Sequence, residues 1–274
     1  MSDANLSANL SANLSANLSE AARAAGGPIE AIGALYMLHP ETFARSAEHG
    51  YPNPFAGYFA GRGGVLGDAE ASTVNAVFAV FEPNAVKMFW EQGVAVHGAA
   101  GGAAVYHEQV AEFARKHLTG ADGLDRIAEL GQRVVDSAPV LGLPLFAGWK
   151  SMPLAEDTPA RAMQVMFKLR ELRGSVHMAA LAVSGLTPIE AHMLNRGAEY
   201  CAFFGWPEPF ASGAGKESDR QVAEDTTNRR MAEIMAAALS VEEMHELGRL
   251  ASAALSTATA SAAVPEEAGV HSPR

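Results

Sequence analysis

The chain has 274 residues and a formal net charge of −11; 49% of its residues are hydrophobic and 19% are charged. This composition is typical of a globular protein and excludes a disordered chain, and the length suits one large domain. The negative charge disfavours nucleic acid as a partner, because it repels a phosphate backbone. The single cysteine, Cys201, excludes an internal disulfide and a zinc site built from cysteines.

The two ends of the chain carry no recognisable targeting signal and are predicted to lie outside the folded domain. Residues 4–19 are four copies of Ala-Asn-Leu-Ser, so residues 1–19 are predicted to be a low-complexity tail, in which a weak amphipathic helix is left open. Residues 255–274 are predicted to be a disordered tail. No apolar run reaches the roughly 18 residues of a membrane span, so we expect a cytoplasmic protein without a membrane partner.

Helix signals dominate residues 20–254, which are predicted to form a single domain with a subdivision left open near residues 138–157. Thr187 with Glu190, and Ser240 with Glu243, form capping boxes. Few runs alternate between apolar and polar residues, so very little β structure is expected beyond a short extended piece near residues 140–146. The predicted helices cover residues 20–37, 41–49, 53–62, 69–81, 83–92, 99–118, 122–137, 158–184, 188–195, 198–204, 219–238 and 241–254. The fold class is therefore all-α, a multi-helix bundle around a long central helix at about residues 158–184.

The most distinctive local motif is the glycine-rich segment GYFAGRGG at residues 57–64, at the end of the predicted helix 53–62. Gly57 and Gly61 share one small helical face, which suits close packing against another helix, and Tyr58 and Arg62 share the next face. The segment is no phosphate loop, because it lacks the lysine and the preceding strand of that motif. Two interpretations stay open: helix packing with a structural arginine, or Tyr58 and Arg62 projecting into a cavity.

The long helix carries two stripes of residues. The first is apolar, is predicted to be central core and consists of Val165, Leu169, Leu172, Val176, Ala180 and Val183. The second contains Arg170, Gly174 and His177, and Arg173 lies one turn from His177. Gly174 leaves room for a ligand or another backbone, so Arg170 and His177 could meet an anion or a carbonyl there. Alternatively, Arg170 or Arg173 pairs with a carboxylate from another helix or with Glu171, and His177 is an ordinary core histidine.

Metal and cofactor chemistry has little support in the sequence. No His-Glu-x-x-His motif, nucleophile elbow, Cys-His pair or dinucleotide fingerprint occurs. Glu108 and Glu112 share a helical face and could join a metal site, but two acids at this spacing are more typical of a solvated face. We therefore expect no metal site, and the sequence leaves any cofactor unknown.

Three segments together resemble a known family: residues 57–66 (GYFAGRGGVL), 144–147 (PLFA) and 169–181 (LRELRGSVHMAAL). Their order and spacing are similar to those of an actinobacterial helix-turn-helix family distantly related to MarR-type regulators, over about residues 20–250. The resemblance implies DNA binding and a homodimer. The polar positions that match the family are Tyr58, Arg62, Arg170, Arg173 and His177. The chain departs from the family at residues 197–217, where a winged segment is shortened or missing and no basic recognition helix can be read.

Three functions are consistent with these patterns. The first is binding of a small apolar or anionic ligand in a pocket between helix 53–62 and helix 158–184. The second is a small-molecule enzyme in which His177 acts as acid or base while Arg62 and Arg170 hold an anion. The third is a DNA-binding transcriptional regulator. The first fits the small-residue faces and the absence of a basic groove best, whereas the ligand itself cannot be read from the sequence.

Overall fold

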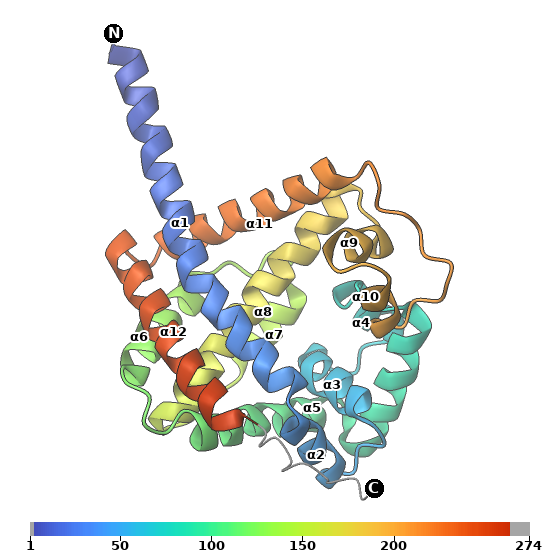
Figure 1. Cartoon of the computed structure of the whole chain (residues 1–274). Coiled ribbons are helices and arrows are strands. Elements are labelled where there is room, and N and C mark those ends of the chain that lie inside the picture. Colours follow the sequence, from blue (N-terminus) through green and yellow to red (C-terminus); the bar gives the residue numbers. More distant parts are fainter. Residues whose placement is uncertain (1–2, 264–274) are drawn as a thin grey trace, which may run out of the picture.

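The computed structural model describes residues 3–263, with side chains described from residue 16 onward. Twelve α-helices and one short 3-10 helix make up this part of the chain, which contains no β-strand (Figure 1). The prediction of an all-α fold is therefore confirmed. The elements are α1 (Asp3–Leu38), α2 (Pro40–Glu48), α3 (Pro54–Gly63), η1 (Gly64–Leu66), α4 (Ala71–Val77), α5 (Pro83–His117), α6 (Leu124–Ser137), α7 (Pro144–Ser151), α8 (Thr158–Ser184), α9 (Pro188–Asn195), α10 (Ala198–Phe203), α11 (Glu217–Ala236) and α12 (Val241–Ala262).

Helix α8 runs through the middle of the molecule and contacts α1, α5, α6, α7 and α11. Its first apolar stripe forms core as predicted, since Val165 and Leu172 are fully buried, but Val183 is 82% exposed because it lies in the last turn. The helix ends at Gly185, which adopts the left-handed conformation (φ 77°) that favours glycine. At its start the cap is the Asp157 side chain, which accepts a hydrogen bond from the backbone N–H of Ala160.

Helices α3 and α5 pack closely because glycines line their contact. A Cβ atom at Gly61 of α3 would collide with the Tyr106 side chain of α5, and one at Gly93 of α5 would collide with the Ala56 carbonyl of α3. The small face predicted for the glycine-rich segment is therefore used for helix packing. This close approach also positions Tyr58 and Arg62, on the adjoining face, toward α8.

The structure corrects several predicted boundaries. Residues 144–151, partly predicted as extended, form helix α7, which begins at a proline. Helix α5 consists of two helical stretches that meet at a kink at Gly98 (φ 71°, ψ 174°), so both predicted helices, 83–92 and 99–118, are present and the first one continues to residue 97. Residues 3–19 belong to α1, so the predicted low-complexity tail is helical over this stretch.

The C-terminal helix also extends beyond its predicted end. Helix α12 continues to Ala262, and Ala258 and Ala262 are buried, so residues 255–262 are not part of a disordered tail. Helix α12 packs against α1 and α5. The small alanine, serine and threonine residues of this stretch show no clear apolar period, so its helix could not be predicted from the sequence. The rest of that predicted tail, from residue 264 on, lies outside the described residues. The subdivision at residues 138–157 stays a prediction.

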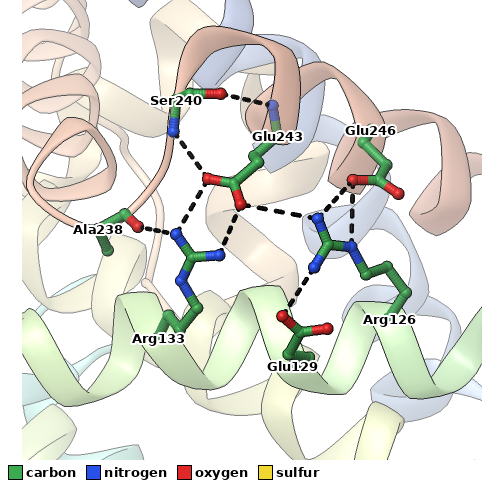
Figure 2. Close-up of polar contacts among 7 residues, drawn as sticks. All are labelled: Arg126, Glu129, Arg133, Ala238, Ser240, Glu243 and Glu246. Carbon is green, nitrogen blue, oxygen red and sulfur yellow. Dashed lines mark hydrogen bonds and ion pairs between the residues drawn. The ribbon is translucent and has the colours of Figure 1, made fainter.

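Helices α6 and α12 are joined by an ion network on the surface (Figure 2). The Arg133 guanidinium donates to both carboxylate oxygens of Glu243, at 2.6 and 3.0 Å, and Arg126 donates to Glu246 at 2.9 and 3.1 Å. Glu243 also accepts from the backbone N–H of Ser240, completing the predicted capping box. The hydrogen bonds from Arg133 hold the pKa of Glu243 at about 2, well below its ordinary range. None of the described helices is both long and apolar enough to cross a membrane.

Candidate functional site

A cavity of about 310 Å³ lies where α3, α4, α7 and the C-terminal half of α8 meet. This volume falls within the range of small-molecule pockets, about 300–1,000 Å³. Most of its wall is apolar, and the polar side chains are few. The apolar and aromatic lining includes Ala76, Val77, Phe78, Val80, Phe81, Leu145, Met178 and Phe204, and the polar lining is Tyr58, Arg62, Arg170 and Ser175. The predicted location, between helix 53–62 and helix 158–184, thus contains a cavity.

Arg62 and Glu171 form a buried ion pair beneath this cavity. The Nε and Nη2 atoms of Arg62 donate to Oε1 and Oε2 of Glu171, at 3.1 and 2.9 Å. The side chain of Glu171 is fully buried and that of Arg62 is 8% exposed. Burial by itself would raise the pKa of Glu171, but the charges of Arg62 and Arg170 outweigh it and hold the pKa below its ordinary value. Glu171 is therefore a carboxylate at neutral pH, shared by two guanidinium groups.

Aromatic rings hold Arg62 in place on the cavity side. Its guanidinium carbon lies 4.9 Å from the ring centroid of Tyr58 and 4.8 Å from that of Phe78, within the range of cation–π interactions. The Arg62 Nη1 group donates to the hydroxyl of Tyr58. The indole of Trp149 donates to the Arg62 carbonyl at 3.1 Å. Each nitrogen of the Arg62 side chain therefore has a protein partner.

Arg170 differs from Arg62 in having donors without a partner. Its Nη1 atom donates to Glu171 Oε1 at 2.7 Å, while its Nε atom is buried without a hydrogen-bond partner. The side chain is 21% exposed and lines the cavity. One turn later, a Cβ atom built at Gly174 would meet no atom within 4 Å, so the glycine leaves open space beside Arg170. The wall therefore contains two guanidinium groups that share the carboxylate of Glu171, and Glu30 of α1 lies near enough to Arg170 for their charges to interact.

Arg173 and His177 face α11 and α1 and do not line this cavity. Arg173 lies 3.6 Å from Glu224 and 4.0 Å from Glu30. The Nδ1 atom of His177 is 3.1 Å from the hydroxyl of Thr227. Burial lowers the pKa of His177 below its ordinary value. The five predicted site residues therefore divide into Tyr58, Arg62 and Arg170 at the cavity, and Arg173 and His177 at the contacts of α8 with α1 and α11. His177 is therefore apart from Arg62 and Arg170, the two arginines considered as its partners in holding an anion.

Sequence reasoning missed two parts of this region. The aromatic wall comes from Phe78, Phe81 and Phe204, which lie in short segments between helices and show no periodic pattern. Lys168 is buried in α8, where its Nζ atom donates to the carbonyl of Met152 at 2.5 Å. Burial lowers its pKa to about 8. Gln164, one helical turn earlier, contacts the same loop between α7 and α8, because its side chain accepts from the backbone N–H of Ala155. This spacing of four residues was the sequence signal that Lys168 and Gln164 share a face of α8.

Two glutamates of α5, Glu108 and Glu112, form ion pairs with arginines. Glu108 pairs with Arg115 at 2.6 Å, and Glu112 lies 3.5 Å from Arg45. Both glutamates therefore take part in ion pairs near the surface. This arrangement is the solvated face that their spacing was considered typical of. Among residues 16–263, whose side chains the structure describes, no group of three or more His, Cys, Asp or Glu side chains is placed to hold a metal ion.

Comparison with known proteins places the chain in a family by its sequence. A family model described as a helix-turn-helix family matches residues 22–263, which is most of the chain and includes every helix that lines the cavity. No curated protein and no solved structure gives a significant match. The extent of the family match carries the assignment, and on that basis the chain belongs to this helix-turn-helix family.

Proposed function

We propose that this helix-turn-helix family protein binds a small organic anion with a flat apolar body in the cavity between α3 and α8. One observation carries the proposal: an aromatic cavity whose wall contains two arginines, with only one carboxylate between them. A buried charge requires a partner, and a ligand carboxylate would supply the second negative charge. Aromatic carboxylates of one or two rings are the ligand class that meets both requirements.

The arginines and the aromatic residues of the cavity have different proposed roles in binding. The Arg170 side chain is 21% exposed and makes one hydrogen bond, through Nη1, so its guanidinium is the group that would contact the ligand carboxylate. Arg62 has no free nitrogen, so its role is to hold Glu171, which in turn fixes Arg170. Phe78, Phe81 and Phe204 would cover the apolar body of the ligand. Arg170 is therefore expected to determine affinity for the anion, and the aromatic wall to determine the shape of ligand accepted.

Ligand titration with matched probes tests this proposal. Isothermal titration with 1-naphthoate and with its neutral counterpart 1-naphthylmethanol should show saturable binding of the acid and weaker binding of the alcohol. The variant R170M keeps the length of the side-chain stem and removes the guanidinium, and we expect at least tenfold weaker naphthoate binding. The control R230M removes an arginine of α11 that pairs with Glu233 at the surface. Equal affinity of R170M and R230M for naphthoate would contradict the proposal.

Two finer features are proposed from sequence resemblance alone. They are a distant relationship to MarR-type regulators and assembly as a homodimer. Family membership supports the helix-turn-helix assignment, and the ligand proposal depends on the cavity. A gel-shift experiment with and without naphthoate would extend the test to DNA binding.

A further inference from the structure

A second cavity, of about 420 Å³, lies on the opposite face of α8, between α8, α1 and α11. Successive residues of an α-helix are rotated by about 100°, so Leu169 and Arg173 point away from Gly174 and Met178, which line the first cavity. No residue belongs to the lining of both cavities. The second cavity is therefore a separate space and does not depend on the function proposed above.

The second cavity exists because α1 lacks side chains where it passes α8. Gly26 and Gly27 line it, and a Cβ atom built at either residue would meet no atom within 4 Å. Pro28 follows inside the same helix. Glycine and proline are both poorly suited to the interior of a helix. Gly26 and Gly27 thus lie where larger side chains would fill the cavity, although glycine weakens the helix.

The deep part of this cavity is apolar. Ile29 of α1, Leu169 of α8, and Met231 and Met235 of α11 line it, and all four are less than 10% exposed. Methionine side chains adjust to the shape of what they contact, so Met231 and Met235 suit a flexible aliphatic chain. Flat aromatic rings, which form the wall of the first cavity, are absent from the lining here.

The polar lining of this cavity has donors that the protein leaves unused. It consists of Arg23, Glu30, Arg173 and Asn228. The nearest carboxylate oxygens to Arg173 are 3.6 and 4.0 Å away, and no hydrogen bond reaches its guanidinium from the described residues. The Oε1 atom of Glu30 is buried without a partner, and burial raises its pKa above the ordinary value. Arg173 therefore lies within ion-pair distance of two carboxyl groups, Glu30 and Glu224, but has a hydrogen bond to neither.

We propose that this second cavity binds an aliphatic monocarboxylate, with its carboxylate on Arg173 and Arg23 and its chain along Met231 and Met235. The carboxylate would supply hydrogen-bond acceptors to guanidinium groups that now lack them. The chain would fill the space left by Gly26 and Gly27. The predicted ligand differs from that of the first cavity in shape, because one wall is methionine-lined and the other aromatic.

Titration of the full chain with sodium decanoate, kept below its micelle concentration, tests this second site. We expect saturable binding of one decanoate and much weaker binding of decanol. The ¹³C-methyl resonances of Met231 and Met235 should shift on addition of decanoate. R173M should weaken decanoate binding at least tenfold. G27L should do the same by filling the cavity while improving helix propensity, so it keeps the test valid if R173M folds poorly.

The two cavities are tested against each other with the same set of variants. R170M should leave decanoate affinity unchanged, and R173M should leave naphthoate affinity unchanged. Failure of decanoate to bind, or unchanged decanoate affinity in R173M or in folded G27L, would overturn the second site only. Loss of decanoate binding in R170M would also overturn it, because the fatty acid would then occupy the first cavity.

Discussion

The buried arginines beneath the first cavity and the exposed arginines between α6 and α12 use the same residue types for different purposes. On the surface, Arg133 and Arg126 each make paired hydrogen bonds to glutamates, and both side chains are partly exposed (Figure 2). In the core, Glu171 is fully buried and serves two arginines at once. The difference teaches that an ion pair alone is no sign of function. The informative feature is a largely buried guanidinium that makes one hydrogen bond and lines a cavity, as at Arg170.

Removal of Arg62 should have the largest effect on stability. In R62L, Glu171 loses its bidentate partner while it stays buried, and loss of one partner of a buried pair costs about 3–5 kcal/mol. Urea denaturation followed by circular dichroism would measure this change. A loss no greater than that of a surface variant such as R133M would show that Glu171 reaches solvent, against its burial in the structure.

Replacement of both partners should recover most of that loss. R62L/E171L removes both members of the buried pair, and apolar side chains often replace a buried ion pair at little cost. Arg170 loses its hydrogen bond to Glu171 in this variant. Arg170 is 21% exposed and can turn toward water. We expect the double variant to unfold at a higher urea concentration than R62L. A double variant less stable than R62L would mean that Glu171 is required for more than its pair with Arg62.

Substitution in the surface network should have a smaller effect that depends on salt. R133M removes the two hydrogen bonds to Glu243, but both side chains are solvated, so screening weakens the interaction. The difference in urea midpoint between wild type and R133M should shrink when sodium chloride is raised from 0.05 to about 0.5 M. A difference that persists at high salt would place this pair in the same class as Arg62 and Glu171.

The smallest predicted effect is a dependence on pH at Glu243. Its folded pKa of about 2 lies below the ordinary value of 4.5, so its contribution is present above about pH 4.5 and is lost as the pH falls toward 2. The difference in urea midpoint between wild type and E243Q should therefore shrink from pH 7 to pH 3. A difference that stayed constant across this range would contradict the role assigned to the ionised carboxylate.

The sequence predicted the backbone better than the contacts between helices. Helix α8 begins and ends where its proline and Gly185 indicate, and the capping box at Thr187 marks the start of α9. Helix α7 was missed because eight residues beginning at Pro144 are too few to show a helical period. Such local signals depend on neighbours in the chain, which is why they could be read without the structure.

The composition of the site could be predicted only in part, because periodicity shows which residues share a face and not which helix covers it. Arg170 and His177 lie on one side of α8, yet Arg170 lines the cavity beside α3 and His177 contacts Thr227 of α11. The pair of Arg62 with Glu171 joins residues 109 positions apart. Such long-range contacts depend on how the helices assemble, and neither propensity nor spacing encodes that directly.

The location of a bound aromatic acid tests the central claim most directly. A crystal structure of the protein with 1-naphthoate should show the carboxylate within hydrogen-bond distance of Arg170, and the rings beside Phe78 and Phe81. Arg62 and Glu171 should keep the contacts described here. Naphthoate bound elsewhere, or an empty cavity between α3 and α8 at a saturating concentration, would contradict the claim that this cavity is an anion site.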